Sequence, residues 1–367
     1  MADGVYNVKD YGAAGDGQTD NTKAFETAWS AACAVQGKAT IVIPEGAYLL
    51  GPTIFKGPCK GIMVMQVKGQ LLASTHLEAY NQYWLHFQYI NGLVISGGGR
   101  FNGQGASAWP YNQCKKTNNC KPLPMNLVFS FVTNATIKSI SSIDSKFFHI
   151  HVFESRNIIF DSIKISAPQD SPNTDGIHIA DSTNIEVANS IIGTGDDCIS
   201  IGPGCTNLTI FKVLCGPGHG ISVGSLGKNA GEKDVIGLKV SNYNLTGTTN
   251  GLRIKTLQAA YSSSHKGSDA YDCCTRVVMR RRAAAPMAAT PAGKNPAGAT
   301  ARRGSSTCGR CLTGRTARGV DGTHRGTRPR RRRCPQGRPV ARAAPPAGVP
   351  PAGEGGDPTL RRTARRR

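Results

Sequence analysis

The sequence predicts an all-β protein, a single-stranded, right-handed parallel β-helix with an N-terminal capping helix. Four segments share one pattern, in which an asparagine is followed by apolar residues in near alternation. They begin at Asn134, Asn157, Asn184 and Asn207, at intervals of 23, 27 and 23 residues. Short alternating runs of β-branched residues are typical of strands, and strands that recur at such intervals indicate a solenoid.

The repeat extends beyond these four copies. A weaker copy occupies residues 234–240, and an earlier relative occupies residues 91–95. Leucine-rich repeats are the main alternative, but the leucine spacing and helical segments typical of them are absent from the sequence. In a parallel β-helix, equivalent positions on successive coils lie about 4.8 Å apart. Residues one coil apart in sequence are therefore expected to be neighbours in space.

The N-terminal sequence predicts a helix that caps the end of this solenoid. Residues 20–33 fit a helix with Asp20 at its N-cap and an apolar face of Phe25, Ala28, Trp29 and Ala32. We expect this helix to cover the open end, which otherwise exposes strand edges. Residues 40–43 then read as a strand and 44–46 as a turn. The glycine-rich residues 98–105 lack the Lys-Ser/Thr ending of a phosphate loop, so they predict a strand-to-turn element at the rim of a cleft.

Charged residues recur at coil-like steps in the second half of the repeat. Asp175 lies in residues 173–176 (NTDG), Asp196 and Asp197 lie in 195–198 (GDDC), and His219 lies in 218–220 (GHG). The steps from 175 to 196 and from 197 to 219 are 21 and 22 residues. Residues 253–255 (RIK) follow 34 residues after His219. The register predicts that these side chains gather on one face.

This set has the chemistry that hydrolysis of an acidic polysaccharide requires. Glycoside hydrolysis uses one protonated and one ionised carboxyl group, whose separation distinguishes inversion from retention. Three clustered aspartates repel one another, so one of them is expected to hold its proton near neutral pH. Arg253 and Lys255 alternate along a strand and face the same side, where they suit a substrate carboxylate. His219 is placed to tune the acid or to contact the sugar.

Each motif alone has a plainer interpretation. An Asp-Asp pair after glycine is often a turn or a calcium site, and Asn-Thr-Asp-Gly is a common turn sequence. A histidine between glycines fits a loop, and Arg-Ile-Lys fits a solvated strand. The combination is specific because the motifs occur in order and in register with the repeat.

The four motifs resemble those of the polygalacturonases, which form family 28 of the glycoside hydrolases, and most closely those of plant pollen exopolygalacturonases. The match continues upstream through residues 6–13 (YNVKDYGA) and 15–20 (GDGQTD), and covers roughly residues 5–256. The resemblance implies a parallel β-helix that hydrolyses α-1,4-galacturonosyl linkages with inversion, in the exo mode, and that needs no metal or other cofactor.

The resemblance also implies a role for each motif residue. Asp196 would be the general acid, Asp175 and Asp197 would activate the water, and His219 would support the acid. Substrate-binding residues would be Asn173, Arg253 and Lys255. Cys198 and Cys215, which flank the Asp pair and His219, are predicted to form a disulfide. The expected partner is pectin, bound by a monomer, with no nucleic acid and no membrane.

The cysteines indicate a secreted protein. Residues 1–256 contain Cys33, Cys59, Cys114, Cys120, Cys198, Cys205 and Cys215, without a Cys-x-x-Cys pair, so zinc is not expected. Cys114 and Cys120 would close a small loop, and the odd count leaves one thiol. Glycosylation sequons occur at Asn134, Asn207 and Asn244. No signal peptide precedes residue 5, so either the leader is absent from this chain or the protein is cytosolic. The cysteines favour the first alternative, a secreted protein of the cell wall.

The composition changes abruptly after residue 266. Residues 267–367 carry 23 Lys and Arg and 5 Asp and Glu, which is +18 of the chain's +21. Three interpretations are open: an arm that binds nucleic acid or pectin, a nuclear-targeting signal, or out-of-frame translation of a GC-rich region. We favour the third, because a tail so poor in apolar residues cannot form a core. The predicted organisation is a β-helix domain over 1–266, truncated at its C-terminus, and a non-native tail over 267–367.

Two other classes remain as alternatives. The first is another pectinase: a hydrolase of substituted galacturonan, or a calcium-dependent lyase, which a chelator would inhibit. The second is a non-catalytic, pectin-binding or defective remnant of such an enzyme.

Overall fold

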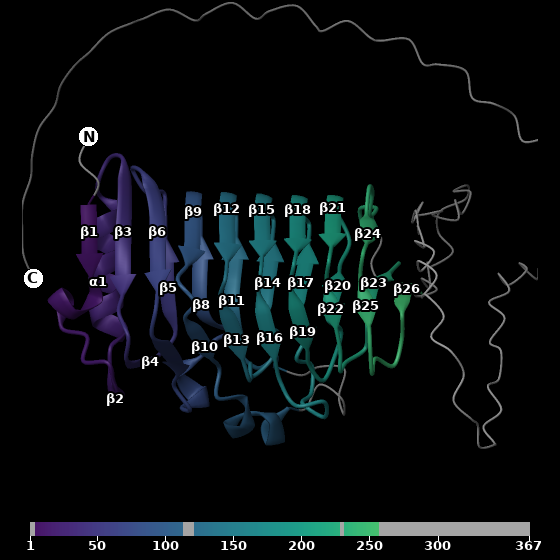
Figure 1. Ribbon diagram of the computed structural model, residues 1–367, viewed down its shortest axis with the longest axis horizontal. Coiled ribbons are helices and arrows are strands. Elements are labelled where there is room, and N and C mark those ends of the chain that lie inside the picture. Colours follow the sequence, from purple (N-terminus) through teal and green to yellow (C-terminus); the bar gives the residue numbers. More distant parts are fainter. Residues whose placement is uncertain (1–3, 113–120, 228–230, 257–367) are drawn as a thin grey trace, which may run out of the picture. The chain divides into compact units, whose positions relative to one another are not determined.

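The computed structural model describes residues 4–112, 121–227 and 231–256, all within one compact unit. Its strands form three parallel sheets that run side by side along one axis (Figure 1). From β3 onward each coil contributes one strand to each sheet, in a repeating order, and neighbouring strands of a sheet come from successive coils. This is a parallel β-helix, so the predicted fold class is confirmed.

The three sheets are named A, B and C here. Sheet A contains β1 (Gly4–Asn7), β3 (Lys38–Ile43), β6 (Ile62–Val67), β9 (Asn91–Ser96), β12 (Thr133–Lys138), β15 (Arg156–Asp161), β18 (Thr183–Ala188), β21 (Thr206–Phe211) and β24 (Lys239–Ser241). Sheet B contains β2 (Asp16–Asp20), β4 (Ala47–Leu50), β7 (Gln70–Ala73), β10 (Arg100–Asn102), β13 (Ser141–Ile143), β16 (Lys164–Ser166), β19 (Ile191–Gly193), β22 (Leu214–Cys215) and β25 (Asn244–Leu245). Sheet C contains β5 (Thr53–Lys56), β8 (Tyr83–Gln88), β11 (Met125–Ser130), β14 (Ile150–Phe153), β17 (Ile177–Ala180), β20 (Ile199–Ile201), β23 (Ile221–Leu226) and β26 (Leu252–Thr256).

The asparagine repeat is explained by a hydrogen-bonded ladder at the start of the sheet A strands. The amide Nδ2 of Asn134 donates to Oδ1 of Asn91, and Asn157, Asn184 and Asn207 continue the series over 2.6–3.0 Å. The last four have φ near +56°, a left-handed conformation that asparagine tolerates better than most residues. The sequons at Asn134 and Asn207 therefore lie within this ladder.

Inward-facing side chains of the three sheets fill one continuous core. Aromatic rings stack along its axis from coil to coil: Phe55 on Phe87 at 4.8 Å between centroids, and Phe87 on Phe129 at 5.3 Å. The inward residues Ile177, Ile199 and Ile221 of sheet C are buried in the same core. Their outward-facing neighbours are consequently held at fixed positions on the other face of sheet C.

A helix covers the N-terminal end, as predicted. Helix α1 (Thr22–Cys33) buries Phe25, Ala28 and Trp29 in the core, and Trp29 Nε1 donates to the Lys56 carbonyl at 3.0 Å. The predicted N-cap was wrong by one residue, since Asn21 occupies that position and the helix begins at Thr22. Asp20 still accepts the Thr22 backbone N–H at 2.9 Å. Among the described residues, we find no helix with the length and apolar character needed to cross a membrane.

Four 3₁₀ helices lie in the connections: η1 (Val8–Tyr11), η2 (Leu77–Ala79), η3 (Gly105–Ser107) and η4 (Trp109–Tyr111). The glycine-rich segment 98–105 contains β10 and leads into η3, as the predicted strand-to-turn element requires. The predicted disulfide Cys198–Cys215 is present, and Cys33 pairs with Cys59. Cys205 is a buried free thiol. Cys114, Cys120 and the predicted tail over 267–367 lie outside the described residues.

Candidate active site

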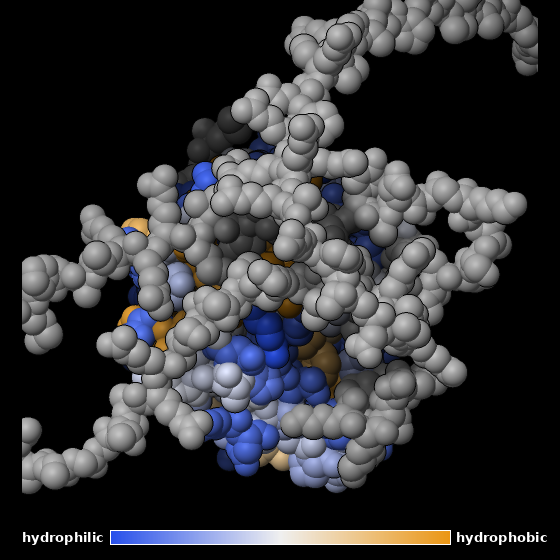
Figure 2. All heavy atoms as spheres, turned by 90° about the vertical axis from the view of Figure 1, so that its right-hand side faces the viewer, coloured by the Kyte–Doolittle hydropathy of each residue, from blue (hydrophilic) through white to orange (hydrophobic). Residues whose placement is uncertain are grey.

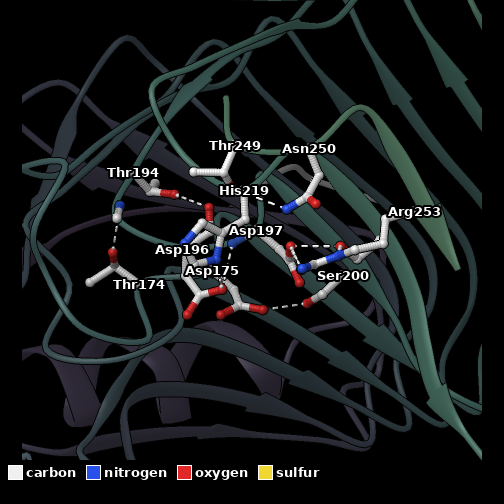
Figure 3. A network of polar contacts seen from close by, with 12 residues as sticks. Thr174, Asp175, Thr194, Asp196, Asp197, Ser200, His219, Thr249, Asn250 and Arg253 are labelled. Atoms are coloured by element: carbon white, nitrogen blue, oxygen red, sulfur yellow. Dashed lines mark hydrogen bonds and ion pairs between the residues drawn. The ribbon is translucent and has the colours of Figure 1, made fainter. Parts of the chain in front are cut away.

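The predicted site residues gather where the chain passes from sheet B to sheet C on successive coils. Asp175 precedes β17, Asp196 and Asp197 precede β20, and His219 precedes β23. Backbone hydrogen bonds join these turns: the Gly176 N–H donates to the Asp197 carbonyl at 2.9 Å, and the His219 N–H donates to the Asp196 carbonyl at 2.8 Å. Figure 3 shows the side chains converging, with Arg253 reaching them from β26.

The glycines of the motifs allow these turns to pack closely. A Cβ on Gly195 would collide with the Ser171 backbone carbonyl. Gly218 and Gly220, on either side of His219, have φ of +142° and +87°, which other residues rarely adopt. These glycines let backbone from adjacent coils approach, so that the carboxylates between them come together.

A second row of side chains lies on the outward face of sheet C, three residues further along each coil. His178 pairs in register with Ser200, Ser200 with Ser222, and Ser222 with Arg253. Ser200 and Ser222 are 3% and 0% exposed, although they face outward, because the site residues cover them. The two serines of this row lie under the carboxylates and donate hydrogen bonds to them.

Asp175 is buried, and the Ser200 hydroxyl donates to its Oδ2 at 2.6 Å. Burial raises the pKa of Asp175 well above its usual value, and the negative charge of Asp196 raises it further. The Ser200 hydrogen bond and the charge of Lys255 oppose this rise in pKa. Asp175 is therefore the carboxyl group on which burial and charge repulsion act together.

Asp197 is equally buried, but two cations bind it. Arg253 Nη2 lies 2.7 Å from Oδ1 and Lys255 Nζ lies 2.9 Å from Oδ2, while the Ser222 hydroxyl donates to Oδ1 at 2.6 Å. Arg253 Nε also donates to Ser222 Oγ at 3.0 Å. The two cations thus neutralise the charge of Asp197. The side chains of Arg253 and Lys255 are each about one-third exposed, so they are also accessible to a ligand.

Asp196 is the most accessible of the three aspartates. Its side chain is 19% exposed, compared with 2% for Asp197. His219 Nδ1 lies 2.9 Å from Oδ1 of Asp196, and the Asp197 backbone N–H donates to the same oxygen at 2.8 Å. An accessible carboxyl group with an adjacent imidazole has the position of a group that exchanges protons with a ligand.

The neighbouring turn holds Asn173, the other predicted substrate-binding residue. Its Oδ1 accepts a hydrogen bond from Asn112 Nδ2 at 3.2 Å, so the residue that directly follows η4 reaches the edge of the site. Thr174 Oγ1, the next residue along, accepts the Gly195 N–H at 3.0 Å and ties the two aspartate turns together.

Asp196, Asp197 and His219 offer ligand atoms that lie within 4.8 Å of one another, as a metal site requires. A cation placed there would compete with Arg253 and Lys255, since both oxygens of Asp197 already accept from them. Charge balance in this cluster is therefore supplied by protein side chains.

One end of the outward face of sheet C is covered. Val128 of β11 faces away from the main core, yet it is 1% exposed because it belongs to a second cluster with Ala108, Leu123, Met125 and Phe147. Trp109 of η4 anchors this covering segment by donating its Nε1 hydrogen to the Ser145 carbonyl at 3.0 Å. We call residues 103–112 and 121–125 the β11 wall. It lies one coil beyond β14, on the side of the site opposite to β26.

Three contributors were missed by the sequence analysis: Ser200, Ser222 and His178. Their spacing carried the necessary signal, since each serine lies 22 residues after its predecessor in the row. Asn112 gave no signal, because its contact depends on the path of the covering segment.

A parallel β-helix with three clustered aspartates, a histidine and an Arg-Lys pair on one sheet defines a class of carbohydrate-active proteins. Comparison with known proteins gives the family: residues 33–266 match the model for glycosyl hydrolases family 28. The chain belongs to that family.

Relatives and solved structures agree with this assignment. The chain is 46% identical over 261 residues to an exopolygalacturonase of Zea mays, covering 71% of this chain and 64% of that one. It is 47% identical over 254 residues to an exopolygalacturonase of Platanus acerifolia, covering 69% and 67%. Among solved structures, a polygalacturonase from Erwinia carotovora matches with a TM-score of 0.58 and 25% identity, covering 65% and 70%. The chain spans about 64% of the length of the first of these relatives.

Proposed function

We propose that this protein hydrolyses α-1,4-galacturonosyl linkages of polygalacturonan, with inversion and in the exo mode. The observation that carries the proposal is that the three aspartates have three different environments. Asp196 is accessible and paired with His219, Asp175 is buried with one hydroxyl donor, and Asp197 is bound by two cations. Family membership and relatives named exopolygalacturonase support it.

Each residue then has a role. Asp196, protonated, donates its proton to the leaving glycosidic oxygen, and His219 holds its carboxyl group in place. Asp175 and Asp197 face the attacking water on the other side of the sugar. Arg253 and Lys255, together with Asn173, bind the galacturonate at the cleavage point, where the substrate carboxylate shares the cations with Asp197.

The exo mode is supported by the β11 wall. If Arg253 and Lys255 bind the sugar on the β26 side of the cleaved bond, the sugar on the other side lies toward β17 and β14. The wall covers the outward face of β11, one coil beyond β14, so it would block a chain that extends in that direction. An enzyme closed on that side removes sugars from a chain end.

We infer an extracellular, monomeric protein acting in the plant cell wall. Within the described part of the chain, the disulfides Cys33–Cys59 and Cys198–Cys215 favour an oxidising compartment. The relatives named exopolygalacturonase come from plants.

The test is reducing-end release from polygalacturonate by the purified chain and by Asp196→Asn. Loss of the general acid should lower kcat by roughly 10²- to 10⁴-fold. Binding of oligogalacturonate should persist, because the cations that hold it remain. Asp181→Asn is the matched control. Asp181 directly follows β17 and forms an ion pair with Lys233 instead of a site residue. Equal turnover by Asp196→Asn and the parent would contradict the assignment, and a folded parent that binds without turnover would favour the non-catalytic alternative.

A further inference from the structure

Two serines in one row of sheet C connect Asp175 and Asp197 to side-chain nitrogen atoms. Ser200 lies between Asp175 and His178, and Ser222 lies between Asp197 and Arg253. The two arrangements are one coil apart and alike in geometry. They differ in the residue that bonds to the serine, which is His178 in one and Arg253 in the other. This difference gives the two aspartates different abilities to take up a proton.

The relay through Ser200 is reversible. Ser200 Oγ lies 2.6 Å from Asp175 Oδ2 and 2.7 Å from His178 Nδ1, and it carries one hydrogen. When Asp175 is ionised, the Ser200 hydroxyl donates to it and accepts from an Nδ1–H of His178. When Asp175 is protonated, it donates to Ser200, which then donates to an unprotonated Nδ1. A neutral imidazole can carry its hydrogen on either nitrogen, so both directions are satisfied.

The relay through Ser222 has only one direction. Arg253 Nε always carries a hydrogen and cannot accept one, so Ser222 must accept from Arg253 and donate to Asp197. Arg253 Nη2 and Lys255 Nζ donate to the same carboxylate. A proton on Asp197 would have to displace one of the three hydrogen bonds that Ser222, Arg253 and Lys255 donate to its two oxygens. This environment holds Asp197 as a carboxylate.

We propose that Asp175, and not Asp197, takes the proton from the attacking water, and that Ser200 and His178 are the positioning residues that reverse their hydrogen bonds to accommodate it. The inference rests on the proposed hydrolysis and deepens it. The O–H bond of water breaks and its proton goes to Asp175, while the water oxygen bonds to the anomeric carbon. The glycosidic C–O bond breaks, and the leaving oxygen takes the proton of Asp196. Exchange with solvent then returns a proton to Asp196 and removes one from Asp175.

The surroundings of Asp175 agree with this role. The charged groups that face it are Asp196 and Asp197 from the neighbouring turn and Lys255 from β26, with His178 behind Ser200. Burial lowers the pKa of His178 to about 3, and His151 and Lys255 act in the same direction. His178 is therefore a neutral imidazole across the working pH range, as a reversible relay requires.

The first test measures the carboxyl group directly and needs no turnover. Carbon NMR of aspartate-labelled protein follows the Asp175 carboxyl through a pH titration, with Asp175→Asn identifying the signal. Ser200→Ala removes a hydrogen bond to the ionised form, so the Asp175 titration should move to higher pH, whereas Ser200→Thr should leave it in place. Ser130→Ala is the matched control, because Ser130 is a buried sheet C serine that bonds His86 at 3.0 Å. An unchanged Asp175 titration in Ser200→Ala would overturn the proposal.

The second test uses turnover. Ser200→Ala and His178→Ala should lower kcat by about 10- to 100-fold with little change in KM, and raise the acidic limb of the pH profile. His178→Asn, whose amide can both donate and accept, should restore part of the loss. Ser222→Ala should leave the acidic limb where it is, because Arg253 and Lys255 still hold Asp197. An acidic limb that moves equally in Ser222→Ala would contradict the distinction between the two relays.

Azide tests the base directly, because it attacks the anomeric carbon in place of water without losing a proton. It should restore cleavage of the glycosidic bond in Asp175→Ala, with galacturonosyl azide as the product, and leave Asp197→Ala inactive. The reverse pattern would overturn the assignment. If the parent releases no sugar from galacturonan, the proposed function fails, while the carboxyl titration still decides the relay.

Discussion

At the residue scale, the site places three carboxyl groups in three different environments. The buried Asp175 is the one whose ionisation is opposed most directly, by burial and by Asp196. Asp197 is equally buried, but the Arg253–Lys255 pair compensates for its charge. One residue type thus supplies different proton affinities because its surroundings differ, as acid–base catalysis requires.

The raised pKa of Asp175 predicts a stability effect that depends on pH. A carboxyl group whose pKa is higher in the folded state favours folding at low pH, and this contribution is lost as the pH rises through its folded pKa. Asp175→Asn removes the buried charge and keeps an acceptor for Ser200. At pH values above the folded pKa of Asp175 it should be more stable than the parent by on the order of 1 kcal/mol.

Denaturant unfolding at several pH values tests this prediction. The difference in unfolding free energy between the parent and Asp175→Asn should shrink as the pH falls and Asp175 becomes protonated in the parent. A variant that is less stable than the parent at every pH tested would show that the ionised Asp175 does not destabilise the fold.

At the scale of elements, the asparagine ladder supports sheet A. Asn157 donates to Asn134 and accepts from Asn184, with φ of +56°. Asn157→Ala should destabilise the protein by about 2–3 kcal/mol, because it loses two hydrogen bonds and places alanine at a positive φ. Asn157→Gly keeps the backbone unstrained, so in thermal or denaturant unfolding it should lose less. Equal losses of stability in the two variants would show that the positive φ of residue 157 does not affect the free energy of unfolding.

The β11 wall predicts the product pattern. A closed cleft should release only monogalacturonate from a galacturonate oligomer, at early as well as late times. Trp109→Ala removes the anchor to Ser145, so chromatography of its products should show di- and trigalacturonate as well. Tyr111→Ala is the control, since Tyr111 is 66% exposed in the same segment. Longer products from the parent would contradict the exo mode.

Some of these elements were predictable from sequence and others were not. The repeat of Asn134, Asn157, Asn184 and Asn207 predicts the coils because each copy has the same local conformational requirement. The same register predicts that Asp175, Asp197 and His219 meet. It cannot predict that Arg253 and Lys255 bind Asp197, because the strand pattern gives the face of a side chain and not its partner. The β11 wall and the Cys33–Cys59 disulfide depend on irregular segments, whose paths follow from no period.

At the scale of the whole molecule, the β-helix turns a sequence period into a reactive surface. Each coil contributes one turn and one outward side chain, and about 4.8 Å of rise separates equivalent positions. Residues from 173 to 255 can act together only because β17, β20, β23 and β26 are neighbours in sheet C. Figure 2 shows hydrophilic residues beside hydrophobic ones at the end of the molecule on the β26 side.

The most direct test of the central claim is the anomeric configuration of the first sugar released. Proton NMR of polygalacturonan mixed with the purified chain resolves the two anomers before they interconvert. An inverting hydrolase built from these aspartates should release β-galacturonate first from the α-linked substrate. Initial release of the α-anomer, or no release from a folded chain that binds the polymer, would contradict the account.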